Sequence, residues 1–217
     1  MNWDIHYQEL AEYLLPYQSD FTQYRFEGGK VMDKINTSIG PTSAKALANS
    51  LHGLVTSSYI QWFKLLPRDQ KMQRSVFLKQ YLEQVTYKMY QVLNSGESGF
   101  QTAVDELYQN MVVFGTGIIS IESTFLQGRP WITFRTHNLR NIVVEEDNTG
   151  KVDTIYREMC LTSKQAIQEF GIENISGAIH KDFTSGGSKE FKFLHVIAPN
   201  IFLKAGAKGP LGMPFMS

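Results

Sequence analysis

A Gly-X-Gly triplet, Gly115-Thr116-Gly117, lies inside the apolar stretch VVFGTGIISIE. Such a triplet can bind phosphate when a strand precedes it and a helix follows, because the free amides at the start of that helix then face the anion. Here the order is reversed, since a helical pattern precedes the triplet and a β-branched run follows it. A helix end presents carbonyl oxygens, which repel phosphate. We therefore interpret Gly115 as the left-handed residue that ends a helix and Gly117 as the residue that lets the chain turn into a strand.

The histidines show no spacing that is typical of a metal or catalytic site. They stand at positions His6, His52, His137, His180 and His195. The sequence contains no His-x₃-His, no His-Glu-x-x-His and no pair of cysteines, so no known ligand spacing supports a metal. It also lacks the Gly-x-Ser-x-Gly motif of a serine nucleophile. We predict no catalytic, cofactor-binding or metal-binding residues.

Three other groups with reactive side chains have simpler interpretations. The acidic run Glu145-Glu146-Asp147 lacks the spacing of a calcium loop, which favours a solvated turn. Asp105 and Glu106 are adjacent on a predicted helix and point about 100° apart, so they cannot work together as an acid/base pair. Cys160, between Met159 and Leu161, is predicted to be a buried small hydrophobic residue and not a nucleophile.

The composition is that of an ordinary globular protein. The chain has 217 residues, 42% hydrophobic and 19% charged, with Lys plus Arg equal to Asp plus Glu at 21 each. Balanced charge gives no overall field that favours nucleic acid or an anionic membrane. The sole cysteine cannot form an internal disulfide and the first residues do not form a secretory signal, so we expect a cytosolic chain. The longest apolar stretch, 111–119, is about half the roughly 20 residues that span a membrane.

The first hundred residues are predicted to be mainly helical. One helix should end before Pro16, and 16–41 should be an extended arm with short helical pieces. A second helix is predicted from Pro41, capped by Thr42 or Ser43. Its apolar positions are Ala44, Leu47, Ala48, Leu51 and Val55.

The strongest helix prediction covers 69–93. Its apolar seam consists of Leu78, Leu82, Val85, Met89 and Val92. Because the seam is only about two heptads long, packing against the rest of its own domain is favoured over a coiled coil. Ser98 is predicted to cap the next helix, which buries Val104, Leu107, Tyr108 and Met111. Tyr59, Trp62 and Phe63 are interpreted as core and not as a partner-binding patch.

Antiparallel hairpins should follow the helices. The patterns ISIESTF/WITFRT and NIVVEE/KVDTIYREM predict two hairpins, and Thr162 should cap a helix that Gly171 ends. Residues 172–189 are predicted to be a flexible loop, and FKFLHVIAP one more strand. The expected fold is therefore α+β, with a helical amino-terminal half followed by antiparallel β hairpins and a short helix. The expected regions are a helical one (1–117), a β-rich one (118–199, short helix 162–170) and a flexible or truncated tail (200–217).

Four segments carry a resemblance to a known family. In chain order they read EYLLPYQSDFT, GPTSAKALANSLHGLVTSSYIQWFKL, FQTAVDELYQNMVVFGTGIISIE and FRTHNLRNIVVEEDNTGKVDTIYREMCLTSKQAIQEFG. They are similar to the amino-terminal part of the head-to-tail connectors, or portal proteins, of T7-like short-tailed phages, and cover about residues 12–171. The residues matched would belong to the outer, wing-like part of a portal subunit.

The resemblance implies a structural protein without catalytic residues or cofactors. Portal subunits form a ring, usually of twelve copies, at one vertex of the capsid in the virion, after synthesis in the cytoplasm of the host bacterium. The implied partners are further copies of the chain, the capsid protein, the terminase, the tail proteins and double-stranded DNA, which passes through the channel without sequence specificity. No membrane partner is implied. Family members are longer than this chain, so we expect it to be a truncated form.

Two alternatives come from other functional classes. One is an enzyme that binds a nucleotide at Gly115-Thr116-Gly117. The other is an oligomeric adaptor or scaffold protein that associates through the helix from Leu78 to Val92.

Overall fold

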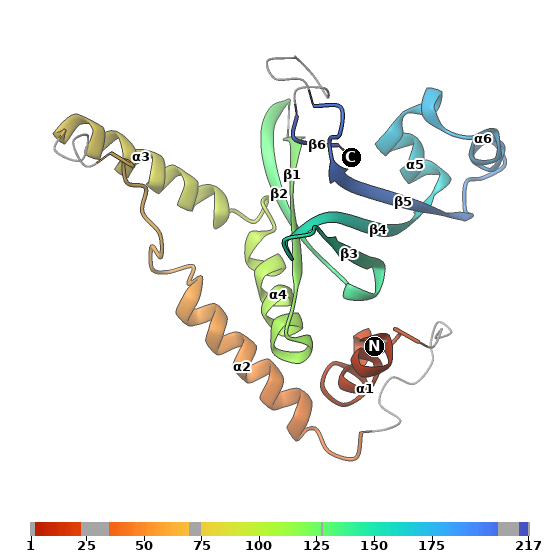
Figure 1. Ribbon diagram of the computed structural model, residues 1–217, viewed down its shortest axis with the longest axis horizontal. Helices are drawn as coiled ribbons and strands as arrows, with labels where there is room; N and C mark the ends of the chain where they lie inside the picture. The colour runs from red at the N-terminus through yellow and green to blue at the C-terminus, as the bar shows by residue number, and fades with distance from the viewer. Residues whose placement is uncertain (1–2, 23–34, 70–74, 127, 204–212, 217) are drawn as a thin grey trace. The chain divides into compact units, whose positions relative to one another are not determined.

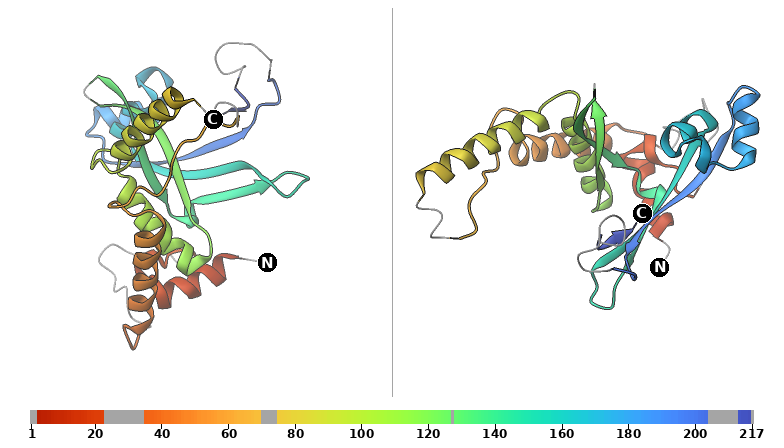
Figure 2. Two further views of the ribbon diagram at one scale, coloured as in Figure 1. Left: turned by 90° about the vertical axis from the view of Figure 1, so that its left-hand side faces the viewer. Right: turned by 90° about the horizontal axis from the view of Figure 1, so that it is seen from above.

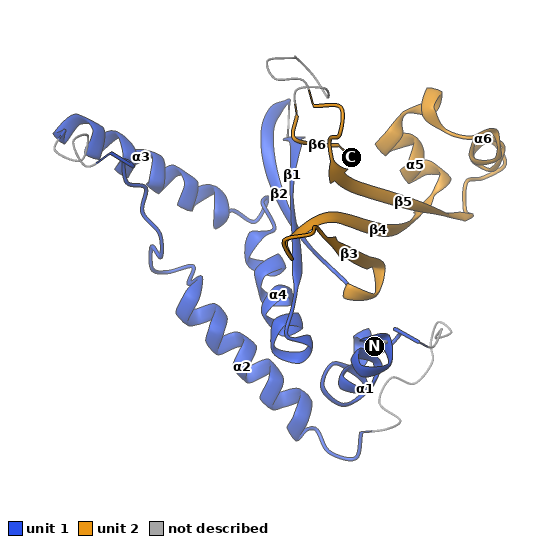
Figure 3. Cartoon of the chain, viewed as in Figure 1, with its two compact units in different colours: residues 1–138 blue, residues 139–217 orange. Residues whose placement is uncertain are grey.

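The computed structural model describes residues 3–22, 35–69, 75–126, 128–203 and 213–216 (Figure 1). The chain divides into two compact units, residues 1–138 and residues 139–217 (Figure 3). The last helix before the strands ends at Phe114, and the first strand begins at Ile118. The compact units divide later, because the first hairpin packs on the preceding helix. The fold is α+β, with helices in the amino-terminal half followed by antiparallel strands and short helices.

Unit 1 contains four α-helices and one hairpin among its described residues. They are α1 (Trp3–Leu14), the 3₁₀ turn η1 (Pro16–Gln18), α2 (Ile39–Val55), α3 (Val76–Leu93), α4 (Phe100–Phe114), β1 (Ile118–Leu126) and β2 (Arg129–His137). The strands pair antiparallel from Ile118 opposite His137 to Leu126 opposite Arg129. Gly128 takes a positive φ of 76° at the turn, a conformation that glycine adopts without strain.

Helix α4 is the centre of unit 1. Its residues Phe100, Val104 and Tyr108 form a buried cluster with Ala48 of α2. Side chains of Leu51, Leu93, Val112, Ile119 and Phe134 pack against this cluster. Helix α4 lies against the hairpin in both views of Figure 2. The hairpin is joined to it by hydrogen bonds from Phe134 N to Ser98 O (2.8 Å) and from Thr136 Oγ1 to Ala103 O.

The helix starts differ from the predictions. Helix α2 begins at Ile39, after Ser38, so Pro41 lies in its first turn and neither Thr42 nor Ser43 is the cap. Proline is tolerated there because the first amides of a helix have no intrahelical partner. Helix α3 begins at Val76, and its N-cap Ser75 accepts a hydrogen bond from Leu78 N (3.4 Å).

Helix α4 also has a different cap from the one predicted. Its N-cap is Gly99 in the left-handed conformation (φ 67°). The predicted cap Ser98 lies one residue earlier, where its Oγ accepts from Phe100 N (3.2 Å). The predicted hydroxyl therefore bonds the first turn without occupying the cap position.

The described residues of unit 2 form a four-stranded antiparallel sheet with two short helices. Its elements are η3 (Leu139–Asn141), β3 (Ile142–Glu146), β4 (Val152–Thr162), α5 (Ser163–Phe170), η4 (Ile172–Asn174), α6 (Gly177–Thr184), β5 (Glu190–Pro199) and β6 (Phe215–Met216). The strand order is β3-β4-β5-β6. Helix α5 starts with a complete capping box between Thr162 and Gln165 and ends at Gly171, as predicted.

For unit 2, the prediction of a loop at 172–189 is wrong, and the predicted tail lies only partly within the described residues. Residues 172–189 are not a loop throughout, because η4 and α6 lie within them. Helix α6 buries Ile179, and Asp182 Oδ2 accepts from Ser163 Oγ of α5 (2.9 Å), so tertiary contacts support a helix that the local pattern does not reveal. In the predicted tail, β6 pairs with β5, while residues 204–212 and 217 lie outside the described residues.

Candidate subunit interface

The Gly115-Thr116-Gly117 junction has the geometry of a helix end. Gly115 takes the left-handed conformation (φ 75°), and its amide donates to Met111 O (3.0 Å). A Cβ built on Gly117 would lie 2.7 Å from Leu107 Cδ1 and 3.0 Å from Leu107 O. Gly117 is therefore required for close packing of β1 against α4. The predicted structural roles of both glycines are confirmed, and the carbonyl end of α4 is the end nearest the triplet.

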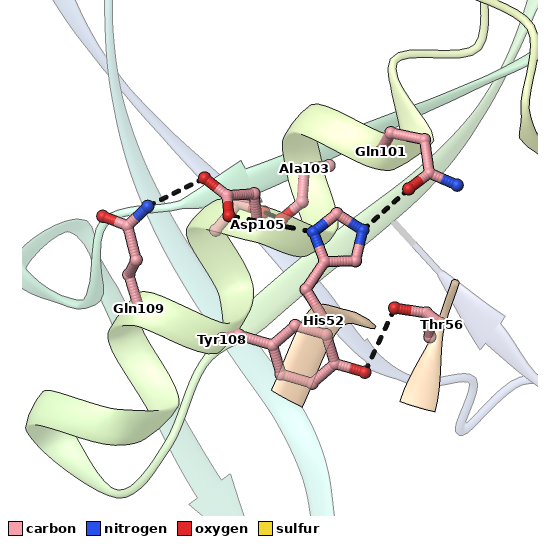
Figure 4. Close-up of polar contacts among 8 residues, drawn as sticks. His52, Thr56, Gln101, Ala103, Asp105, Tyr108 and Gln109 are labelled. Carbon is pink, nitrogen blue, oxygen red and sulfur yellow. Dashed lines mark hydrogen bonds and ion pairs between the residues drawn. The ribbon is translucent and has the colours of Figure 1, made fainter. Parts of the chain in front are cut away.

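A polar network joins α2 to α4 (Figure 4). Gln101 Nε2 donates to Asn94 Oδ1 (2.6 Å), which turns Gln101 Oε1 toward His52, so His52 Nε2 donates to it (2.7 Å). On the other side of the ring, His52 Nδ1 lies 3.8 Å from Asp105 Oδ1, an ion pair when the imidazole is protonated. Both ring nitrogens thus face protein groups, and the network is an arrangement that positions two helices.

The neighbours of this network complete the contact between the helices. Gln109 Nε2 donates to Asp105 Oδ2 (2.8 Å), and Thr56 Oγ1 donates to Tyr108 Oη (3.3 Å). Asp105 therefore points toward His52 and Gln109, whereas the next residue, Glu106, is exposed. Sequence reasoning missed this network, because His52 and Asp105 are 53 positions apart and no spacing rule joins them.

The other candidate chemical groups lie on the surface of unit 2. Hydrogen bonds to Asp147 Oδ1 from the Thr149 hydroxyl (2.6 Å) and from the amides of Lys151 and Thr149 lower the pKa of Asp147, as in a tight solvated turn. Cys160 is exposed, so its predicted burial is wrong. It lies on β4 opposite Lys192, on the face of the sheet that carries charged side chains. Among the described residues, no three His, Cys, Asp or Glu side chains are grouped to hold a metal ion.

The same face carries a surface ion pair. Lys192 Nζ donates to Glu158 Oε1 (2.7 Å). The contact lowers the pKa of Glu158 and raises the pKa of Lys192, because each charge favours the other. Between β4 and β3, the Tyr156 hydroxyl donates a hydrogen bond to Glu145 Oε2 (3.1 Å), and this bond raises the pKa of Tyr156.

Helix α3 exposes an unusual amount of apolar surface. Its single buried residue is Thr86, whose Oγ1 accepts from Leu65 N (3.1 Å), and Tyr90 Oη donates to Ser57 O (3.1 Å). The predicted seam is not buried by the described part of the chain: Met89 is 43% exposed and the other seam residues are half-buried. Phe77, just before the seam, is 78% exposed. The prediction that the seam packs on its own domain is therefore wrong for much of the helix.

The aromatic residues before α3 are less buried than predicted. Trp62 stacks on Phe100 with the rings 6.2 Å apart and 10° from parallel, yet it is 40% exposed. Phe63 is half-buried and contacts Tyr90, while Tyr59 is 96% exposed. The core interpretation holds for the inner faces of Trp62 and Phe63 and is wrong for Tyr59.

Helix α2 contributes a second exposed face, one without charged residues. At 100° per residue, the members of this face lie within a sector of about 120°. They are Ser43, Ala46, Leu47, Ser50, Gly53 and Leu54, all exposed. A helix face turned to water is usually polar or charged. The predicted apolar set pointed mainly to the opposite side of the helix, where Ala48 is buried, although one of its members, Leu47, belongs to this exposed face.

No helix of the described residues is long and apolar enough to cross a bilayer. Because of their exposure, the faces of α2 and α3 described above are candidate surfaces for contact with other protein.

The chain matches known proteins along its length. The family model described as "Bacteriophage head to tail connecting protein" matches residues 1–217. The "Probable portal protein" of Bordetella phage BPP-1 is 28% identical over 202 residues, which cover 91% of this chain and 35% of the relative. The "Portal protein" of Salmonella phage epsilon15 is 24% identical over 221 residues, covering 100% of this chain and 38% of the relative. The chain thus spans little more than a third of these relatives, and it belongs to the family of bacteriophage head-to-tail connecting proteins.

Proposed function

We propose that this chain is a structural subunit of a phage portal, the ring at one capsid vertex through which DNA is packaged and later ejected. The observation that carries the proposal is the match of the head-to-tail connector family along residues 1–217, supported by two portal relatives. In this proposal the chain has no catalytic activity. Its partners are other copies of itself, the capsid protein, the terminase, the tail proteins and the DNA, and its location is the virion.

The structure supports a role in assembly. Helix α2 turns an uncharged face to water and α3 a largely apolar one, and such faces are typical of protein contact surfaces. A ring forms when one surface of each copy binds a different surface of the next and the rotation closes. Balanced charge also suits a channel wall, because each phosphate that a protein neutralises strengthens binding and would hold the DNA in place.

The experiment is the mass of the purified chain by light scattering, with negative-stain imaging of any large species. We expect a ring-shaped homo-oligomer that becomes more abundant with concentration. A monomer at every concentration, with no ring found by imaging, would contradict the proposal.

A second candidate, an adaptor or scaffold protein, is favoured by the exposure of α3. It would associate by pairing α3 with α3 and would give a small coiled-coil oligomer in place of a ring. The mass and the shape of the oligomer distinguish this candidate from a ring, and the Val85→Asp variant tests it, because it would dissociate the small oligomer while leaving the circular dichroism of the chain unchanged.

A further inference from the structure

We propose that α3 of one copy docks on α2 of the next copy, so that these two helices form a heterologous contact between neighbouring subunits. The surface on α3, called the apolar stripe, consists of Phe77, Leu78, Tyr81, Leu82, Val85, Met89 and Val92. The surface on α2, called the small face, consists of Ser43, Ala46, Leu47, Ser50, Gly53 and Leu54. This inference rests on the proposed ring and names the surfaces that would join its subunits.

The apolar stripe is separate from the side of α3 that holds the helix to its own chain. At 100° per residue, Thr86, Tyr90 and Leu93 occupy one side of the helix, and they make the contacts with Leu65, Ser57, Phe63 and the core. Around the helix axis, the stripe occupies the next sector of about 140°, which runs from Leu82, beside Leu93, to Phe77. Within the described residues, α3 has no packing partner comparable to the pairing of α2 with α4. The described part of its own chain therefore leaves Phe77, Tyr81 and Met89 exposed and the rest of the stripe half-buried.

The area of the stripe is suited to a repeated contact. Phe77 is 78% exposed and Tyr81 56%. At 150–250 Å² for an aromatic side chain, these two rings alone leave roughly 270 Å² in water. The rest of the stripe brings the exposed apolar area to about 500 Å², near the upper end for the largest patch of a monomer. A stable pairwise interface needs about 800 Å² on each partner. The stripe thus supplies more than half of one such surface, and in a ring every subunit makes the contact on both sides.

The small face complements the stripe in side-chain size. Helix packing interlocks the ridges of one helix with the grooves of the other, so large side chains fit best against small ones. The stripe carries two aromatic rings, whereas Ala46, Ser50 and Gly53 on the small face leave room for them, and nothing lies within 4 Å of the position a Cβ would take at Gly53. The small face contains no charged residue, and the sector of the stripe contains one, the exposed Lys88, whose long side chain can keep its ammonium group in water at the rim of the contact. Pairing α3 with α3 would instead place large side chains against large ones.

The lengths of the two helices agree as well. Helix α2 has 17 residues and α3 has 18, so each is about 26 Å long at 1.5 Å per residue. Because the two surfaces differ, the contact is heterologous and each copy can bind two neighbours. This property separates the inference from a symmetric α3 dimer.

The test uses disulfide cross-linking of the full 217-residue chain with Cys160→Ser, which removes its only native thiol. Ser50→Cys places a thiol on the small face, and Tyr81→Cys places one on the stripe. After oxidation, each single variant should run as a monomer on a non-reducing gel, while an equal mixture of the two should give a covalent dimer. The double variant should give a ladder of dimers, trimers and larger species on a non-reducing gel.

The matched control replaces Gln80 and not Tyr81 by cysteine. Gln80 is exposed and neighbours Tyr81 in sequence, but it lies about 100° away around the helix. Ser50→Cys with Gln80→Cys should give at least tenfold less cross-linked product. Labelling with a maleimide verifies that every introduced thiol is accessible before oxidation.

Three results would overturn the inference. They are a dimer from Tyr81→Cys alone, a cross-link within one chain of the double variant, and accessible thiols that give no cross-link in the mixture. If rings form while the mixture gives no cross-link, the docking surfaces are wrong and the proposed function stands. If ladders form but imaging finds no closed ring, the docking is supported and the ring is contradicted.

Discussion

Helices α3 and α4 have similar lengths, 18 and 15 residues, and both carry apolar residues at helical spacing. Helix α4 buries seven residues and contacts α2, the hairpin and α1, whereas the single buried residue of α3 is Thr86. The periodicity of a sequence therefore identifies which side of a helix is apolar, but it does not reveal whether the same chain covers that side. Two predictions test this difference, and a third adds a surface contact for comparison; they are given from the largest expected effect to the smallest.

The first prediction compares one phenylalanine on each helix. Phe100 of α4 is 7% exposed and packs on Trp62 and Phe134, whereas Phe77 of α3 is 78% exposed. Phe100→Ala should lower the free energy of unfolding by about 3–5 kcal/mol, because it removes a buried ring and leaves a cavity. Phe77→Ala should change it by no more than about 0.5 kcal/mol in the monomer. Urea denaturation followed by circular dichroism and tryptophan fluorescence measures both, and equal effects would remove the distinction between the helices.

The second prediction concerns the packing between α4 and β1. Gly117→Ala should lower the free energy of unfolding by about 1–3 kcal/mol, because its Cβ would meet Leu107 Cδ1 at 2.7 Å and the Leu107 carbonyl oxygen at 3.0 Å. Gly53→Ala on α2 is the control, since nothing lies within 4 Å of its Cβ, and it should stabilise the monomer by about 0.5–1 kcal/mol. Thermal melts of the two variants should shift in opposite directions. A neutral Gly117→Ala would mean that β1 can move away from α4 at little cost.

The third prediction has the smallest expected effect, and it concerns the surface ion pair between Lys192 and Glu158, which lies outside both helices. The pKa of Glu158 is lowered from 4.5 by Lys192, so the pair stabilises the fold above that value and its contribution is lost as the pH falls through the lowered pKa of the folded state. In Lys192→Gln, the pKa of Glu158 should rise toward 4.5, as measured by NMR titration of its carboxyl group. The denaturation midpoint at neutral pH should hardly change, because both groups are exposed and solvent screens them. A large shift in that midpoint would show that the pair matters more than a surface contact.

The sequence predicted the elements with strong local signals. Gly115 and Gly171 end their helices as expected, Thr162 caps α5, and both hairpins form. These features depend on a few neighbouring residues whose backbone preferences are strong. Helix α6 was missed because its formation depends on tertiary contacts of Ile179 and Asp182. Cys160 was wrongly predicted as buried because alternation along β4 does not show which face α5 will cover.

The candidate interface was only half predictable. The apolar residues of the seam were found from their spacing, but their exposure depends on what the rest of the chain covers. The small face of α2 contains no charged residue, yet its serines and alanines carry no strong signal of their own. The network of His52 and Asp105 joins residues from different helices, so only the folded arrangement reveals it.

The attachment of the hairpin to α4 has a mechanical consequence. The two are joined just before the helix by Phe134 and Ser98, in its first turn by Thr136 and Ala103, and at its middle by the packing of Gly117 on Leu107. A force pulling the hairpin along the helix axis would load these contacts together, in parallel, and would not peel them apart one after another. Helix α4 and its hairpin therefore form a stiff strut, whereas α3, held mainly by its last two turns, would behave as a compliant arm.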